Sequence, residues 1–312
     1  MSNPETSNQV SRVAILDLGT NTFHLLIADI HELRPVIIHQ DTIAVKLGEG
    51  GISRDYISPE AFDRGLKALK FFRETINQYK VTTVKGAATS AIRGASNGSD
   101  FIDKIKSETG LDLEIINGDR EAELIYTGVK AAVNIEQVSL IVDIGGGSVE
   151  FIICDKTAII WKKSYPIGAA RLMEKFHRTD PISNKELSQI NTYLQTTLTD
   201  LQEKLNLYRP VLMIGSAGSF ETFAELQSPG LKFSFETPDH EINIRGFRDI
   251  SRRIISSSHA ERLQIPQIPA VRVDMIVVAS ILTNYILDIR EFKSLKLSVF
   301  SLKEGLLFDM LK

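Results

Sequence analysis

The sequence is poor in the residues that build disulfides and zinc sites. Its 312 residues include one cysteine, Cys154, and six histidines. A single cysteine excludes an intramolecular disulfide, and the scattered histidines have no spacing typical of zinc ligands. Because Cys154 lies in an apolar stretch, we expect it to be a small core residue.

The sequence also lacks a strong charge of either sign and a long uninterrupted apolar run. The formal net charge is −3, so we expect neither a DNA partner nor a polybasic membrane anchor. The most apolar late segment, Met275–Ile289, is too short and too interrupted by polar residues to span a bilayer. Polar residues 1–11 predict a disordered tail rather than a signal peptide, so the expected location is cytoplasmic.

A glycine-rich turn between two apolar segments is the most informative feature present. The segment that begins at Val138 ends in Asp143, and a second apolar segment runs to Ile153. The turn between them contains Gly145, Gly146, Gly147 and Ser148. Consecutive glycines are expected where the chain needs positive φ or lets a ligand approach its backbone. The N–H groups of such a turn can bind phosphate oxygens, with Asp143 holding a metal ion or orienting a water; an ordinary hairpin is the alternative.

A second copy of this pattern lies near the N-terminus, in Arg12–Ile30. One constant offset in numbering aligns Asp17 with Asp143, Gly19 with Gly145 and Thr22 with Ser148. Two matched hairpins with the same Asp-x-Gly sequence indicate a duplicated domain. Two such loops that face each other would form a phosphate clamp in the cleft between the halves.

Two charged residues outside the hairpins are candidates for the same cleft. Arg93 follows the expected strand Val81–Ala88, in the position where α/β folds often place ligand-binding side chains, although a solvated surface arginine fits equally well. Glu121 lies in the first turn of the expected helix Asn117–Val133. Acidic residues are favoured there by the helix dipole alone, but the helix begins beside the phosphate loops, where a carboxylate can act as a general base.

The remaining pattern predicts three strands followed by alternating helices and strands in each half, which is typical of a mixed α/β layer fold. Apolar spacing predicts one long helix over Ser183–Leu207 and a strand over Leu111–Ile116, whereas Gln227–Ile244 is expected to be loop or irregular strand. The segment Gly215–Ser219 forms a further strand-to-helix glycine loop, in which the N–H groups near Gly215 and Gly218 can face a ligand.

Several motifs together resemble the exopolyphosphatase and guanosine pentaphosphate phosphohydrolase (Ppx/GppA) family. They are DLGTNTFHLLI, LGEG, ATSAIR, INGDREAELIYTGV, IVDIGGGSVE, PIGAARL and LKEGLL, and they run from about residue 12 to the last residues. The resemblance implies two duplicated ribonuclease-H-like domains of the actin-like ATPase superfold, residues 12–134 and 135–300, with an interdomain active site. It also implies that the last helix, 301–312, packs on the first domain.

The resemblance further implies a role for each matching residue. Glu121 would be the base, and Asp143 and Glu150 would be catalytic residues that hold Mg²⁺ or Mn²⁺. The implied phosphate-binding residues are Asp17, Gly19, Thr20, Asn21, Thr22, Arg93, Gly145, Gly146, Gly147, Ser148, Gly215 and Gly218. Ser301 and Lys303 depart from the family pattern, which more often has Gly and Arg there.

The expected activity is removal of the terminal phosphate of inorganic polyphosphate, of guanosine pentaphosphate, or of both. Two alternatives stay open: a non-catalytic sensor of guanosine penta- or tetraphosphate, and an ATP-dependent small-molecule kinase of the same superfold. The sequence does not decide between a monomer and a homodimer.

Overall fold

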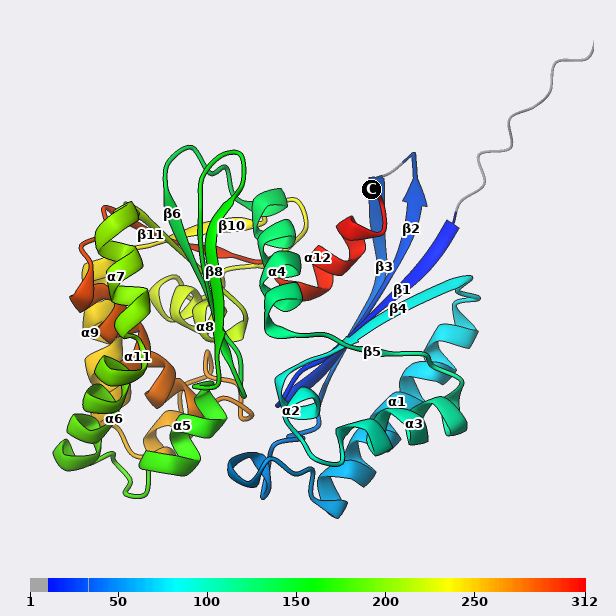
Figure 1. Ribbon diagram of the computed structural model, residues 1–312, viewed down its shortest axis with the longest axis horizontal. Helices are drawn as coiled ribbons and strands as arrows, with labels where there is room; N and C mark the ends of the chain where they lie inside the picture. The colour runs from blue at the N-terminus through cyan, green and yellow to red at the C-terminus, as the bar shows by residue number, and fades with distance from the viewer. Residues whose placement is uncertain (1–10, 33) are drawn as a thin grey trace, which may run out of the picture.

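The computed structural model describes residues 11–32 and 34–312 (Figure 1). The predicted tail therefore lies outside the described residues, except for Ser11, which is the first residue of strand β1. Within the described residues, no helix is long and apolar enough to cross a membrane.

The first sheet has five strands in the order β3-β2-β1-β4-β5. They are β1 (Ser11–Leu18), β2 (Thr22–His31), β3 (Arg34–Ala44), β4 (Thr83–Ala88) and β5 (Glu114–Ile115). Strands β1, β2 and β3 form an antiparallel meander, whereas β4 and β5 add in parallel beside β1. Helices α1 (Pro59–Gln78) and α3 (Gly98–Thr109) contribute to a hydrophobic core with one face of this sheet.

The second sheet repeats this plan, in the order β10-β11-β9-β6-β7-β8. Its strands are β6 (Ser139–Ile144), β7 (Val149–Cys154), β8 (Ile159–Tyr165), β9 (Leu212–Ser216), β10 (Asp239–Ile242) and β11 (Ser294–Ser298). The meander β6-β7-β8 corresponds to β1-β2-β3, and β9 and β11 are parallel to β6. Strand β10 is an additional antiparallel edge.

The other helices connect these strands. They are η1 (Ile52–Arg54), α2 (Ser90–Arg93), α4 (Gly118–Ala132), α5 (Ala169–Phe176), α6 (Asn184–Thr197), α7 (Thr199–Tyr208), α8 (Gly218–Gln227), α9 (Ile244–Ser256), α10 (His259–Leu263), α11 (Met275–Ile289) and α12 (Leu302–Asp309). Those from α5 to α11 belong to the second half. The predicted class, two mixed-sheet α/β halves flanked by helices, is confirmed.

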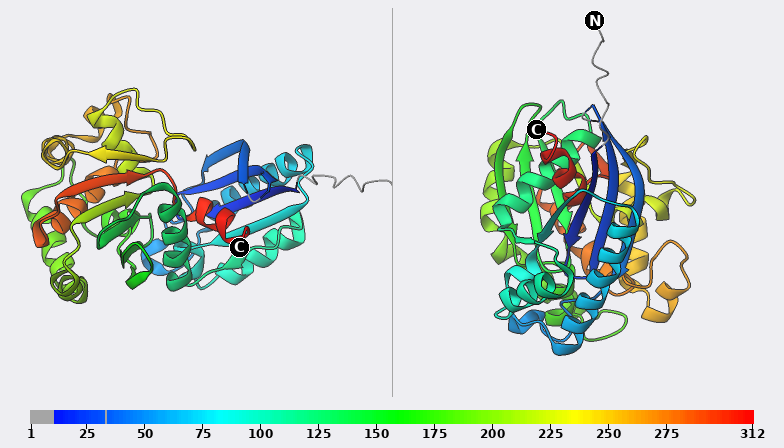
Figure 2. Two further views of the ribbon diagram at one scale, coloured as in Figure 1. Left: turned by 90° about the horizontal axis from the view of Figure 1, so that it is seen from above. Right: turned by 90° about the vertical axis from the view of Figure 1, so that its right-hand side faces the viewer.

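Helices α4 and α12 lie between the two sheets, as Figures 1 and 2 show. A hydrophobic core joins them to both sheets, with Ile15 from β1, Ile141 from β6 and Leu307 from α12 among its buried members. The helices cross very closely at two glycines: a Cβ on Gly128 would lie 2.2 Å from Ser301 O, and one on Gly305 would lie 1.9 Å from Leu124 O. The last helix therefore packs on α4, beside β1 of the first sheet.

Two local expectations differ from the structure. The segment Ser183–Leu207 is not one helix, because the chain breaks at Leu198 between α6 and α7. The hydroxyls of Thr196 and Thr199 bond carbonyls three and four residues back, which bends helices. The apolar stripe continues across the break, since Leu198 itself is fully buried, so its spacing predicted no interruption. In addition, only Glu114–Ile115 of Leu111–Ile116 is paired as a strand. The segment Gln227–Ile244, expected to be loop or irregular strand, contains the short strand β10.

The crossing of α4 and α12 leads to a stability prediction. Gly305→Ala inserts a methyl group against the Leu124 carbonyl, so we expect the free energy of unfolding to fall by about 2 kcal/mol in urea denaturation. Gly246→Ala in α9 is the matched control, because its Cβ would meet only side-chain atoms, the Gln227 amide at 3.3 Å and Asn243 Oδ1 at 3.5 Å. Equal stability of the two variants would contradict the close packing of α12 on α4.

Candidate active site

A cavity of about 180 Å³ lies where the carboxyl ends of β1 and β6 face each other. The β1–β2 turn and the β6–β7 turn form opposite sides of it, and the starts of α8 and α12 contribute further wall. Its lining includes these predicted site residues: Asp17, Gly19, Thr20, Asn21, Thr22, Glu121, Asp143, Gly145, Gly146, Gly147, Ser148 and Gly218. The two Asp-x-Gly turns thus surround one cavity.

Three predicted residues do not line this cavity. Arg93 lies behind it, where its Nη1 donates to Glu121 Oε2 at 2.6 Å and to the Ile116 carbonyl at 3.0 Å. Glu150 is opposite Asp143 in the β6–β7 register but is almost completely buried, and it accepts a 2.6 Å hydrogen bond from Ser164 Oγ. At Gly215 a Cβ would lie 2.0 Å from the Phe220 ring, so this glycine is required for packing.

The glycines of the second turn allow the two turns to approach closely. A Cβ on Gly146 would lie 2.2 Å from the Asn21 amide, and one on Gly147 would lie 2.6 Å from Ser90 Oγ. Among the described residues the glycines with positive φ are Gly50, Gly110 and Gly230, so positive φ does not explain the triple glycine. The explanation is close approach, and the neighbouring groups include the facing turn.

Asp143 is held by two hydroxyl groups from distant segments. Ser216 Oγ, at the end of β9, donates to Asp143 Oδ2 at 2.5 Å, and Ser301 Oγ donates to the same oxygen at 2.7 Å. Ser301 also caps α12, where its backbone N–H donates to Glu304. Burial raises the pKa of Asp143 and outweighs the two hydrogen bonds, which act in the opposite direction. Both hydroxyls use Oδ2, so Oδ1 is left for another ligand.

Glu121 combines burial with a strong cationic partner. Asn117 caps helix α4 by accepting from the Arg120 N–H at 2.8 Å, and this fixes Glu121 in the first turn. Only 6% of Glu121 is exposed. Burial raises its pKa to about 7, although the Arg93 guanidinium opposes the shift. A carboxyl with this pKa exchanges protons readily near neutral pH, as a general base requires.

Two other carboxyl groups are shifted in the same direction. Burial raises the pKa of Asp17 to about 7, against the opposing charge of Lys303. Burial and the charges of Glu121 and Asp143 raise the pKa of Glu150 well above its usual range. The cavity and its immediate surroundings therefore hold more carboxyl groups than can easily ionise together.

Two cations in the cavity wall were not identified as site residues from the sequence. Lys303, at the start of α12, pairs with Glu304 at 2.9 Å. Arg272 contacts Glu221 at 3.3 Å, and a Cβ on Gly218 would collide with its guanidinium. Burial and the charges of these two cations lower the pKa of His24, which also lines the cavity, to about 3. The departure from the family motif at Lys303 was the one sequence signal that marked this position.

A larger cavity of about 690 Å³ adjoins the first. Asn21, Val271 and Met275 line both cavities. The Asn21 amide donates to the Met275 sulfur at 2.9 Å, which joins the first phosphate turn to the start of α11. This contact lies at the boundary between the two cavities.

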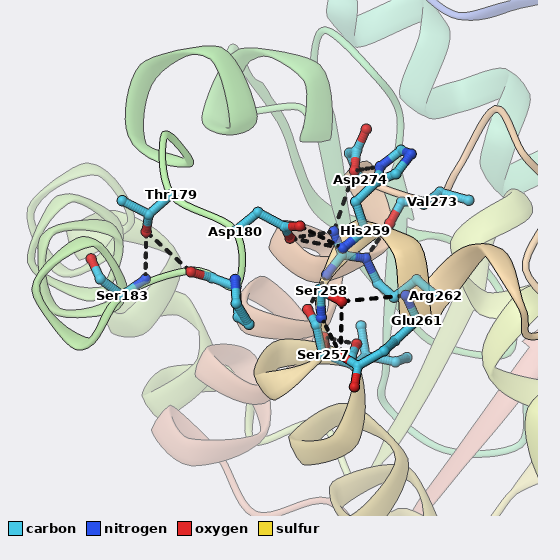
Figure 3. A network of polar contacts seen from close by, with 12 residues as sticks. Thr179, Asp180, Ser183, Ser257, Ser258, His259, Glu261, Arg262, Val273 and Asp274 are labelled. Atoms are coloured by element: carbon cyan, nitrogen blue, oxygen red, sulfur yellow. Dashed lines mark hydrogen bonds and ion pairs between the residues drawn. The ribbon is translucent and has the colours of Figure 1, made fainter.

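A buried arginine organises the wall of the larger cavity (Figure 3). Arg262 is fully buried; its Nε donates to the Val273 carbonyl at 2.7 Å, and its Nη2 lies 3.3 Å from both Asp180 Oδ1 and Asp274 Oδ1. His259 Nδ1 bonds the same Asp274 oxygen at 2.6 Å. The network neutralises two carboxylates of the wall and fixes the residue that precedes Met275.

Oxygen ligands suited to a hard divalent cation are present at Asp17 and Asp143. Within residues 11–32 and 34–312 there is no group of three or more His, Cys, Asp or Glu side chains arranged as a metal site. Mg²⁺ does not need one, because proteins usually bind it through one or two carboxylates together with substrate phosphates. The donor chemistry therefore fits Mg²⁺ or Mn²⁺ when a phosphate ligand is bound.

The sequence pattern of the Ppx/GppA phosphatase family matches residues 26–312. The chain belongs to this family. A crystal structure of an exopolyphosphatase from Cytophaga hutchinsonii is 41% identical and superposes with a TM-score of 0.93 over 96% of this chain and 98% of that chain. A Ppx/GppA family member from Aquifex aeolicus is 26% identical, with a TM-score of 0.81 over 97% and 98% of the two chains. A provisionally named exopolyphosphatase from Haemophilus influenzae is 25% identical over 99% of this chain and 94% of its own length.

The raised pKa of Glu121 predicts how stability depends on pH. In the unfolded chain this carboxyl titrates near 4.5, and in the folded protein near 7. The folded state binds the proton more tightly, so the free energy of unfolding falls as the pH rises from about 4.5 to about 7. The share of Glu121 is on the order of 3 kcal/mol. In urea unfolding across this pH range, the free energy of unfolding of Glu121→Gln should fall by that much less than that of the wild type.

Glu123→Gln is the matched control on the same helix. Glu123 is half-buried, and its hydrogen bond with Lys162 lowers its pKa, so its contribution to stability is lost below pH 4.5 and not above it. The decrease between pH 4.5 and 7 should therefore persist in this variant. An unchanged decrease in Glu121→Gln would contradict the assignment.

Proposed function

We propose that this Ppx/GppA family member is an exopolyphosphatase that hydrolyses the terminal phosphoanhydride bond of inorganic polyphosphate. The observation that carries the proposal is one cavity bounded by two Asp-x-Gly turns and by the shifted carboxyl of Glu121. The similarity to the C. hutchinsonii exopolyphosphatase over nearly the whole chain supports the same activity.

In this mechanism the two turns hold the terminal phosphoryl group and Glu121 activates the water. Backbone N–H groups and the hydroxyls of Thr20 and Ser148 are the available donors, and Lys303 and Arg272 add positive charge. Arg93 orients Glu121 through their 2.6 Å contact. Phosphoryl transfer needs positioning and charge stabilisation more than covalent chemistry, which matches this set of groups.

A divalent cation is part of the proposal. Asp143 would hold Mg²⁺ or Mn²⁺ through its carboxylate, with Ser216 and Ser301 fixing its orientation. Glu150, buried behind Asp143 in the paired strand, would support it from outside the cavity. When bound, the cation neutralises phosphate oxygens and polarises the phosphoryl group.

Guanosine pentaphosphate is the second candidate substrate, and the larger cavity favours it. Its volume, about 690 Å³, is in the range of sites for drug-sized organic ligands. Its wall combines Met173, Met275 and Ile52 with carboxylates, two of which Arg262 neutralises, so it is not a strongly cationic track. Such a wall suits a nucleoside at the end of a phosphate chain better than a long polyanion.

The central prediction concerns Glu121→Gln. With polyphosphate and Mg²⁺, we expect phosphate release to slow by a factor of about 10² to 10⁴, because general-base catalysis is lost. Substrate binding should persist, since the turns and cations are unchanged. Glu123→Gln is the control and should release phosphate at the wild-type rate.

The same assay separates the alternatives. Wild-type protein that releases no phosphate from polyphosphate or guanosine pentaphosphate, while folded, would contradict the proposal. Binding of guanosine pentaphosphate without turnover in either protein would indicate a sensor. Consumption of ATP that depends on a small acceptor would indicate a kinase.

Met275→Ala tests whether the substrate extends into the larger cavity. Removing the thioether widens the boundary at Asn21, so kcat/KM for guanosine pentaphosphate should rise severalfold relative to tripolyphosphate. Met173→Ala is the control, because Met173 lines the larger cavity away from the boundary. An equal change for guanosine pentaphosphate and tripolyphosphate in Met275→Ala would place the nucleoside outside the larger cavity.

A further inference from the structure

A third cavity, of about 380 Å³, lies next to the active site on the side of Arg93. It shares two lining residues, Ser90 and Ser148, with the active-site cavity. Glu121 lines the active-site cavity, and its partner Arg93 lines this one. The Arg93–Glu121 ion pair therefore lies at the boundary, and we call the third space the rear cavity.

The rear cavity is lined mainly by donors and cations. Its cations come from three elements: Arg93 from α2, Lys163 from β8 and Arg171 from α5. The hydroxyls of Ser90 and Ser148 add donors, whereas the Ser164 hydroxyl already donates to Glu150. Helix α4 begins in the wall, with the positive end of its dipole there. Asp119 is the acidic residue of the lining, and it is exposed.

The three cations already have carboxylate partners, but each keeps donors for an anion. Lys163 contacts Asp200 at 2.5 Å, and Arg171 contacts Asp55 at 3.0 Å. Among the described residues, the buried Arg171 Nε has no hydrogen-bond partner. Arg93 uses Nη1 for Glu121 and Ile116, which leaves Nε and Nη2. Guanidinium groups with free donors are well suited to phosphate oxygens.

We propose that the rear cavity is a second anion site that takes inorganic phosphate, the product of the reaction, while the shortened substrate remains in the active site. This inference rests on the proposed hydrolysis and on its direction. In an in-line displacement the water and the leaving oxygen lie on opposite sides of the phosphorus. With Glu121 as base, the water is on the side of Arg93 and the remaining chain is on the far side.

The hydrolysis step leaves the phosphate product beside the rear cavity. The water oxygen forms a new P–O bond while the bond from phosphorus to the bridging oxygen breaks. The bridging oxygen keeps the electron pair and stays with the shortened chain, and one water proton passes to Glu121. Protonation of Glu121 removes the charge that holds Arg93, so Arg93 becomes available to the phosphate that has just formed. Phosphate can then leave past Ser90 and Ser148 without release of the chain.

A binding experiment tests the site without requiring turnover. The active site is first filled with a non-hydrolysable imido analogue of tripolyphosphate, and the binding of radiolabelled inorganic phosphate is then measured at equilibrium. We expect phosphate to bind the filled protein, and Lys163→Glu to weaken this binding about tenfold. Lys156→Glu is the control, an exposed lysine paired with Glu136 at 3.1 Å, away from the cavity, and it should bind phosphate as the wild type does.

Failure to bind phosphate once the active site is filled would overturn the proposal, and so would equal affinity in the wild type and Lys163→Glu. Arg171→Gln provides an independent test of the same cavity, because it removes a guanidinium on another element. Inorganic phosphate should also inhibit turnover, and the inhibition should be non-competitive with respect to polyphosphate. If the protein binds phosphate as expected but hydrolyses neither substrate, the proposed function is wrong and the anion site still stands.

Discussion

The structure depends on how buried carboxyl groups are accommodated in the cleft between the sheets. Asp17, Glu121 and Asp143 line a cavity that is expected to bind a polyanion, and Glu150 is buried directly behind Asp143. The raised pKa values favour the protonated, uncharged form of these carboxyl groups. Hydroxyl groups and cations stabilise the carboxylates that remain ionised. Any bound phosphate or metal ion changes this balance, so ligand binding and protonation must be coupled in this protein.

The sequence predicted the parts of the site that are local. Both Asp-x-Gly turns and the helix that carries Glu121 are continuous segments with recognisable patterns, and all line one cavity. It did not predict that Arg93 contacts Glu121 instead of lining the cavity, because an arginine at a strand end looks the same in both roles. The family resemblance supplied most of the residue roles, and the geometry then separated Glu150 and Gly215 from the residues that line the cavity.

What the sequence could not predict depends on contacts between distant segments. Ser216 and Ser301 are common residues at common helix and strand ends, and their bonds to Asp143 become visible only when β9 and α12 are placed beside β6. Arg272 and Lys303 likewise reach the cavity from segments with no glycine-rich pattern. The break at Leu198 was hidden for the opposite reason, since the apolar stripe there is regular although the backbone is not.

The position of α4 and α12 between the sheets has a consequence for how the protein is made. Synthesis proceeds from the N-terminus, so the first sheet and α4 leave the ribosome before any strand of the second sheet. Until then the hydrophobic core around α4 lacks its members from the second sheet and from α12, among them Ile141 and Leu307. A nascent chain at this stage exposes an apolar helix face, because neither β6 nor α12 has been added. The interface can therefore fold only after the second sheet and α12 have been synthesised, and transiently exposed apolar surface of this kind favours aggregation before that point.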